Sequence, residues 1–421
     1  MDGPAEAAAR AAAEAVARAS YGKLVAWLAA RTRDVAAAED ALSGAFAAAL
    51  ADWPRRGQPA NPEAWLFTVA RRRLIDQDRR RRTGAAAEPA LRLLADGMAA
   101  ASAEPALPDH RLGLLFACAH PALEPGVRAP LMLQVVLGLD AARIASAFLA
   151  SPAAMAKRLV RAKTKIREAG IPFAVPGRDE LAPRLDPVLD AIYAIFTEGW
   201  SDPTAAEGRG ALTGEAIYLA RLVAGLLPDE PEAAGLLALL LHAEARRGAR
   251  RDAAGAYVPL AAQDPAAWDA ALAAEAEALL RRASAFGRIG RFQLEAALQS
   301  AQADGRRSGR PDWPAITRLY DALLALVPSP VVAMNRALAV AGAEGPAAGL
   351  AALDACAADP RLDGYQAYWA ARAELLARCR RAGEARSAYA RAIGLEADPA
   401  VRDFLLARQA ALPPEVSDAS D

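Results

Sequence analysis

One short segment of the chain concentrates long cationic side chains at helical spacing. Residues 151–168 read SPAAMAKRLVRAKTKIRE and hold three of the four lysines in the 421-residue chain. Met155, Leu159, Ala162 and Ile166 follow one another at gaps of four, three and four, which predicts one buried stripe along a helix. The other faces would present cations to phosphates and to base edges in a major groove. The segment therefore predicts a helix that binds duplex DNA.

The residues before this helix support the same interpretation. Gly138 is a suitable end for an apolar helix over 131–137, and Asp140 can cap a short helix over 141–148. Ser151 can cap the basic helix, and Pro152 suits its first position. A basic helix is more often a solvated face, but the short capped helix before it favours a helix-turn-helix. The candidate DNA contacts are Ser151, Ala153, Ala154, Lys157, Arg158, Arg161 and Lys165.

The rest of the chain shows the same helical periodicity, with apolar residues three or four apart and prolines between the segments. No segment alternates apolar and polar residues as a strand does, so the sequence predicts an all-α fold. Composition and punctuation divide the chain into a helical domain at 11–83, a linker at 84–108, a helix-turn-helix domain at 109–172, a linker at 173–185, a helical-repeat domain at 186–412 and an acidic tail at 413–421.

Charge is distributed unevenly although the formal net charge is zero. Residues 1–172 contain 24 Lys+Arg and 17 Asp+Glu, whereas residues 173–421 contain 26 and 33. A basic half that suits DNA is therefore joined to an acidic half that does not. Hydrophobic residues make up 54% of the chain, which excludes a disordered polar protein. The beginning of the chain lacks a secretion signal and no apolar run is long enough to span a bilayer, so we expect a cytoplasmic protein without a membrane partner.

Residues that could support catalysis or bind metal are scattered. The three cysteines are far apart, without a CxxC pair, which favours neither a disulfide framework nor a zinc site. His242 stands alone on an apolar run, and we interpret both His242 and His120 as structural. No clustered acid/base or metal-ligand set emerges, so we predict no enzyme activity, no metal and no cofactor.

Several further motifs accompany the basic helix. RLGLLFACAHPAL at 111–123 precedes the segments up to 163. AEDA lies at 38–41, NPEAWLFTVAR at 61–71 and LID at 74–76. FTEGW lies at 196–200, LLPDEPE at 226–232, PLAAQD at 259–264 and PVVAMNRA at 330–337. These three groups resemble, respectively, region 4, region 2 and the C-terminal extension of an RNA polymerase sigma factor. The resemblance is to the extracytoplasmic-function (ECF) subclass of the sigma-70 family with a tetratricopeptide-like (TPR-like) extension.

This resemblance implies core RNA polymerase and promoter DNA as partners. Region 4 would read the −35 element as a duplex, and region 2 would hold the melted −10 element, with a flipped base captured by the loop expected at 53–61. The implied −10 contacts are Arg55, Arg56, Asn61, Arg71, Arg72 and Arg79. The implied polymerase contacts are Glu39, Asp40 and Phe46. A stacking platform is one interpretation of Trp65, but its apolar neighbours favour a core role.

The expected polymerase-binding helix departs from the family pattern. In the helix expected from about Asp34, the family's usual Gln-Glu pair is replaced by Ser43-Gly44, and a mid-helix glycine costs roughly 1 kcal/mol relative to alanine.

An alternative function is that of a helix-turn-helix regulator that acts without polymerase, with a repeat domain for interactions. The basic helix near 71–82 and the helix from Asp34 favour the sigma factor. The C-terminal domain would bind a protein or peptide regulator and control or support activity.

Overall fold

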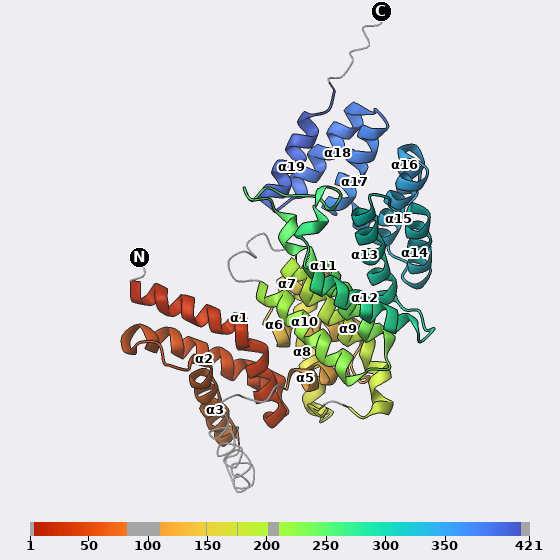
Figure 1. Ribbon diagram of the computed structural model, residues 1–421. Helices are drawn as coiled ribbons and strands as arrows, with labels where there is room; N and C mark the ends of the chain where they lie inside the picture. The colour runs from red at the N-terminus through yellow and green to blue at the C-terminus, as the bar shows by residue number, and fades with distance from the viewer. Residues whose placement is uncertain (1–3, 82–109, 149, 175, 201–209, 414–421) are drawn as a thin grey trace, which may run out of the picture. The chain divides into compact units, whose positions relative to one another are not determined.

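The computed structural model describes residues 4–81, 110–148, 150–174, 176–200 and 210–413 (Figure 1). The regular elements of these residues are helices, and strand-like pairing among them is limited to one antiparallel bridge between Arg251 and Tyr257. The predicted all-α fold class is therefore confirmed for the described residues. None of their helices is long and apolar enough to cross a membrane. The linker predicted at 84–108 and residues 414–421 of the predicted tail lie outside the described residues.

The chain divides into two compact units. The first contains Met1–Gly199 and Gly214–Leu219, and the second contains Trp200–Thr213 and Ala220–Asp421. Each unit has its own buried core.

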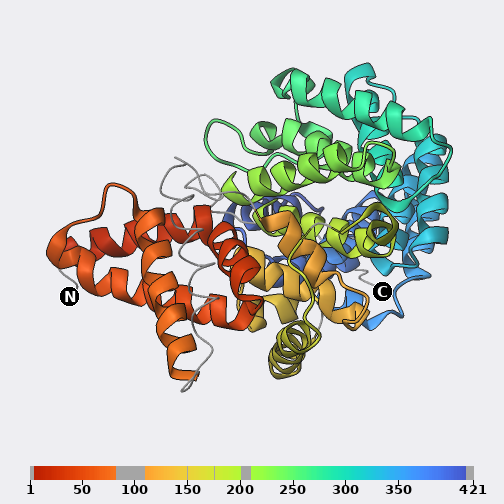
Figure 2. The same cartoon turned by 90° about the horizontal axis from the view of Figure 1, so that it is seen from below.

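The first unit begins with three helices that pack on one another: α1 (Pro4–Thr32), α2 (Val35–Arg56) and α3 (Pro62–Arg81) (Figures 1 and 2). The chain leaves α1 through Arg33, whose φ is 55°, and Asp34 starts α2 by accepting a hydrogen bond from the Ala37 N–H at 3.0 Å. Trp27 meets Phe67 edge to face with ring centroids 4.2 Å apart. Their core also contains the fully buried side chains of Leu24, Leu28, Leu42 and Leu66.

The end of α2 differs from the sequence prediction. The loop was expected to start at Trp53, but α2 continues through Pro54, so Arg55 and Arg56 lie on its last turn. Pro54 removes one backbone donor, but the buried Trp53 holds this turn against the core. The Gly57 N–H then closes the helix on the Trp53 carbonyl at 3.0 Å, with a φ of 81° that favours glycine. The connecting loop is therefore limited to residues 57–61.

Four shorter helices follow in the same unit: α5 (Arg111–Cys118), α6 (Pro125–Leu137), α7 (Ala141–Ala147) and α8 (Pro152–Glu168). α1 packs against α5 and α6, and at Gly22 of α1 a Cβ would lie 2.2 Å from the carbonyl oxygen of Val136 in α6. Only glycine fits that contact. The core of these helices contains Leu114, Leu115, Phe116, Leu131, Met132, Ile144, Met155 and Leu159.

α9 (Arg178–Trp200) starts within the linker that the prolines predicted at 173–185. Leu181 and Leu185, four residues apart, are buried and extend the apolar face of the helix through Pro183. α10 (Gly210–Leu226) follows. Within the first unit, Arg111 of α5 forms an ion pair with Glu215 of α10, and Arg143 of α7 forms one with Glu198 of α9.

The second unit is a series of helices and short 3₁₀ turns. α11 is buried around most of its circumference and packs on both α12 and α13, whereas later helices pack mainly on their sequence neighbours (Figure 1). Its α-helices are α11 (Pro231–Ala245), α12 (Ala270–Ser284), α13 (Arg291–Ser308), α14 (Trp313–Leu326), α15 (Pro330–Ala343), α16 (Pro346–Asp354), α17 (Gln366–Arg378), α18 (Ala382–Leu395) and α19 (Pro399–Ala410). The 3₁₀ turns are Arg247–Arg250, Leu260–Ala262, Pro265–Ala267 and Pro360–Leu362.

Candidate nucleic-acid interface

The local signals that predicted α8 and the helices before it are confirmed. Gly138 ends α6 in the left-handed conformation with a φ of 67°. Oδ1 of Asp140 accepts hydrogen bonds from the Ala142 and Arg143 N–H groups, both at 2.9 Å. Ser151 Oγ accepts one from the Ala154 N–H at 3.3 Å, and Pro152 occupies the first helical position. These contacts fix where α7 and α8 begin.

The predicted division of α8 into a buried stripe and an exposed surface is also confirmed. Met155, Leu159, Ala162 and Ile166 are its four buried residues. All of the candidate DNA contacts are exposed: Ser151, Ala153, Ala154, Lys157, Arg158, Arg161 and Lys165. The apolar stripe anchors α8 on the core, so the rest of the helix is available to a partner.

The cations of α8 fall into two sets with different surroundings. Lys163 forms an ion pair with Glu39 of α2. The Lys163 side chain is only 14% exposed and the Glu39 side chain 13%. Arg167 lies 3.7 Å from Asp34 at the start of α2. In contrast, Lys157, Arg158, Arg161 and Lys165 have no ion-pair partner in the described part of the chain. We call these four residues the free cations of α8.

Three of the free cations line a groove of about 240 Å³. Arg158, Arg161 and Lys165 form one side, and the segment that contains Leu123 and Glu124 forms the other. A groove with several cations and one carboxylate suits a phosphate backbone better than an apolar ligand.

The wall opposite α8 is held by side chains that sequence reasoning treated as structural or did not consider. Arg128 Nη2 donates to the carbonyl oxygens of Leu123 at 2.9 Å and Pro121 at 3.3 Å. Nδ1 of His120 accepts a hydrogen bond from the Ala122 N–H at 3.1 Å, in agreement with a structural role. Burial, with the nearby Arg184 cation, lowers the pKa of His120. No local pattern pointed to Arg128, because its partners are carbonyls of a loop.

The candidate −10 residues lie at the end of α2 and on α3. Arg55 and Arg56 are exposed, and Oδ1 of Asn61 accepts a hydrogen bond from the Ala64 N–H at 3.0 Å, which makes Asn61 the cap of α3. Arg72 is exposed and Arg71 is half-buried on the same helix. Arg79 belongs to α3, but its side chain lies outside the described residues.

Sequence reasoning missed a further cation near these residues. Burial lowers the pKa of Arg71, and the neighbouring cations of Arg31 and Arg72 lower it further. Arg31 of α1 therefore belongs to the same positive patch, and its guanidinium carbon lies 3.9 Å from the centroid of the Trp27 ring. No spacing rule could pair Arg31 with Arg71, because they come from different helices. Trp65, expected in the core, is half-buried with its ring centroid 5.7 Å from that of Trp53.

The candidate polymerase contacts share α2 but differ in exposure. Asp40 is exposed, Phe46 is half-buried and Glu39 is held by Lys163. Burial raises the pKa of Glu39, while the Lys163 ammonium opposes that shift. A Cβ at Gly44 would lie 2.7 Å from Nη1 of Arg73 on α3, at the flexible end of that side chain.

Comparisons with known proteins identify two parts of the chain. Residues 16–83 match the family described as Sigma-70 region 2, and residues 184–284 match a family of unknown function, DUF6596. The N-terminal part of the chain is therefore a sigma-70 region 2 domain. A region 2 domain implies binding to RNA polymerase and promoter DNA, and its presence suggests a sigma-factor function.

The full chain has a relative of similar length. It is 41% identical over 370 residues to the "Uncharacterized protein R00370" of Rhizobium meliloti (strain 1021), covering 86% of this chain and 87% of that protein. The chain belongs to the same family as this protein. No solved structure matches the chain.

Proposed function

We propose that this protein is a sigma factor of the ECF type, which directs core RNA polymerase to specific promoters for transcription initiation. The observation that carries the proposal is the row of free cations on α8, in a chain whose N-terminal part is a sigma-70 region 2 domain. A sigma factor needs one element for the melted −10 sequence and another for the duplex at −35. Region 2 supplies the first, and α8 has the chemistry of the second.

In this proposal α7 and α8 form the helix-turn-helix of region 4, and α8 is the recognition helix. Its exposed N-terminal residues Ala153 and Ala154 permit close approach to base edges. Arg158 and Arg161 have the planar, multidentate donors that read guanine or hold phosphate. The groove beside them would receive the sugar-phosphate backbone.

The −10 element would bind on region 2. Exposed Arg55 and Arg56 border the loop at 57–61, and Arg71 and Arg72 lie on the next helix. Cations along two neighbouring elements can follow a single-stranded backbone while a flipped base enters the loop. Asn61 would act mainly by fixing the start of α3, since its side-chain oxygen is already bonded to Ala64.

The C-terminal half would control or support this activity as a TPR-like helical array. The packing of the later helices supports a repeat array, because these helices pack mainly on their sequence neighbours, as the units of repeat arrays do. Such arrays offer extended surfaces to proteins or peptides, so a regulator of this class would bind there. A sigma factor acts where polymerase acts, and we therefore expect cytoplasmic protein.

Purification of the tagged full chain from its host tests the central part of the proposal. We expect core polymerase subunits to co-purify, and 5′-end mapping after overexpression to reveal a shared promoter sequence. DNA binding without any polymerase association would instead favour a helix-turn-helix regulator that acts alone.

The structure also indicates where to cut the chain to test the C-terminal half. Residues 214–219 belong to the first unit, where Glu215 pairs with Arg111. A deletion should therefore remove 227–421, after the end of α10, rather than begin near 180. Unchanged promoter activity and regulation after this deletion would contradict a controlling role for the second unit.

A further inference from the structure

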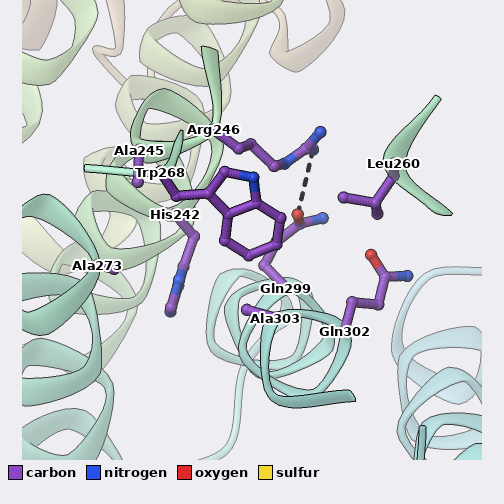
Figure 3. Close-up of a pocket in the computed structure, with 9 residues that line it drawn as sticks. All are labelled: His242, Ala245, Arg246, Leu260, Trp268, Ala273, Gln299, Gln302 and Ala303. Carbon is purple, nitrogen blue, oxygen red and sulfur yellow. Dashed lines mark hydrogen bonds between the residues drawn. The ribbon is translucent and has the colours of Figure 1, made fainter. Parts of the chain in front are cut away.

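The second unit contains a small cavity that none of the proposed DNA or polymerase contacts explains. It lies among α11, α12, α13 and the segment that leads into α12 (Figure 3). Its polar lining comes from His242, Arg246, Trp268, Gln299 and Gln302. Figure 3 shows the Arg246 side chain beside the indole of Trp268, with Gln302 and Leu260 across from them.

The cavity is surrounded by hydrogen-bond donors that lack acceptors. Nε1 of Trp268 and Nε of Arg246 are buried and have no hydrogen-bond partner. Indole and guanidinium nitrogens only donate, so in both cases an acceptor is missing. Nε2 of His242 is also buried without a hydrogen bond, 3.6 Å from Oε1 of Glu277. Buried polar groups nearly always have partners, so the two unpaired donors beside one cavity, Nε1 of Trp268 and Nε of Arg246, call for an acceptor there.

Arg246 is one of three arginines around the Trp200 ring. The guanidinium carbons of Arg246, Arg247 and Arg250 lie 5.2, 5.1 and 4.4 Å from the centroid of that ring. Arg247 pairs with Glu244, and Arg250 donates to the Trp200 carbonyl at 2.9 Å.

Arg246 differs from these two neighbours. Its Nη2 donates to Oε1 of Gln299 at 3.3 Å, and no carboxylate in the described part of the chain pairs with it. Burial, and then the Arg250 cation, lower the pKa of Arg246 to about 10, so it remains charged at neutral pH. Arg246 is therefore a largely buried positive charge at the cavity without a carboxylate partner among the described residues, so the missing acceptor should carry negative charge.

The size of the cavity limits the ligand. Its volume is about 10 Å³, which accommodates one group of the size of a water molecule. Trp268, Gln299 and Gln302 are each partly exposed, so the cavity reaches the surface. A cavity of this size receives a single oxygen atom, and a planar carboxylate can insert one oxygen and match the Nε edge of a guanidinium.

We propose that this cavity binds a carboxylate group. One carboxylate oxygen accepts from Nε1 of Trp268 and Nε of Arg246, and the rest of the ligand remains at the surface. The same chemistry is offered by a free small carboxylic acid and by the C-terminus of a peptide. Either ligand would give the unassigned second unit a defined binding activity.

Tryptophan fluorescence of the full chain tests the proposal at constant pH and ionic strength. The probes are sodium acetate, and a short N-acetylated peptide with uncharged side chains and a free C-terminus, compared with the same peptide amidated. We expect a saturable change with at least one carboxylate, and about tenfold weaker binding in Arg246→Gln. Trp268→Phe should remove the signal. Arg282→Gln, which removes an exposed cation elsewhere in this unit, should bind like the parent chain.

The outcomes separate the sources and the alternatives. A response to acetate identifies a free acid, and a response to the free peptide but not its amide identifies a peptide terminus. No saturable response to either, or an equal response to chloride or phosphate, would overturn the proposal. Unchanged binding in Arg246→Gln would also overturn it. Circular dichroism checks folding, and if Arg246→Gln is unfolded, Arg246→Lys keeps the charge, loses the planar Nε edge and should still weaken binding.

Discussion

Lys163 of α8 forms an ion pair with Glu39 of α2, although the two residues are 124 positions apart in the chain. Both side chains are largely buried, and Arg167 adds a second contact to Asp34 on the same helix. α8 therefore uses one set of cations within the protein and leaves another set free. The same pair occupies Glu39, so a polymerase contact by this carboxylate requires that the pair first opens.

The Lys163–Glu39 pair should contribute measurably to stability. Glu39→Gln leaves a largely buried ammonium without its counter-charge, and we expect a loss of about 1.5–3 kcal/mol in the free energy of unfolding. Urea unfolding of the two single variants and of the double variant Glu39→Gln/Lys163→Met would measure the coupling. The more exposed pair of Arg143 and Glu198 is a control, since Glu198→Gln should cost under about 1 kcal/mol. If the losses of unfolding free energy at Glu39 and Lys163 simply added in the double variant, the result would contradict an ion pair between these two residues.

The free cations of α8 should control affinity for DNA. If Arg158 reads a base, Arg158→Ala should cost on the order of 1–3 kcal/mol at that base pair and relax specificity there. If Arg158 or Arg161 contacts phosphate, its loss should weaken binding uniformly and reduce the salt slope by about 1. Fluorescence anisotropy with promoter and scrambled duplexes at several salt concentrations distinguishes these cases.

Arg167→Ala is a matched control for those variants. It removes one cation from the same helix, but Arg167 lies beside Asp34 rather than among the free cations. Its effect on DNA binding should therefore be small. If Arg167→Ala weakened binding as much as Arg158→Ala, net charge alone would explain the effect and a recognition surface on α8 would not be needed.

Gly44→Ala should stabilise the isolated helix but disturb a contact. Alanine in the middle of α2 gains roughly 1 kcal/mol of helix propensity. The new Cβ would displace the Arg73 guanidinium, which is the flexible end of a side chain. We therefore expect a net gain of up to about 1 kcal/mol in unfolding free energy. Ser43→Ala, at an exposed site on the same helix, is the control. A large loss of stability in Gly44→Ala would show that Arg73 cannot move.

His242 should titrate at a lower pH than an exposed histidine. Burial lowers its pKa, Glu277 opposes the shift, and the cations of Arg307 and Arg246 add to it. The fold favours the neutral His242 ring over the charged one. The stability that comes from this preference is fully present above about pH 6.5 and is lost as the pH falls below that value. The slope per proton is at most about 1.4 kcal/mol per pH unit. NMR titration of the three histidines, assigned with His242→Gln, measures this pKa directly; a value above that of a free histidine would contradict the account.

Local features of α8 could be predicted from its sequence because their causes are local. The Ser151 cap, the Pro152 start and the stripe from Met155 to Ile166 depend on neighbours within one or two turns. Non-local partners could not be predicted. Nothing near Lys163 indicates Glu39, and nothing near Arg158 distinguishes it from Lys163 as a free cation.

Other differences have equally physical reasons. The loop expected from Trp53 begins later because a buried tryptophan outweighs the missing hydrogen bond of Pro54. The cavity beside Arg246 depends on residues from four separate segments, and only the fold shows that Trp268 and Gln302 face it. Neither helix periodicity nor motif spacing contains that information.

Run-off transcription with core polymerase that lacks any other sigma factor tests the central claim most directly. On a promoter found by 5′-end mapping, the full chain should yield one discrete transcript, and the double variant Arg158→Ala/Arg161→Ala should reduce it by about tenfold or more. Arg167→Ala should transcribe like the parent chain. Absence of a discrete transcript with the parent chain, under conditions where it binds the polymerase, would contradict sigma-factor function.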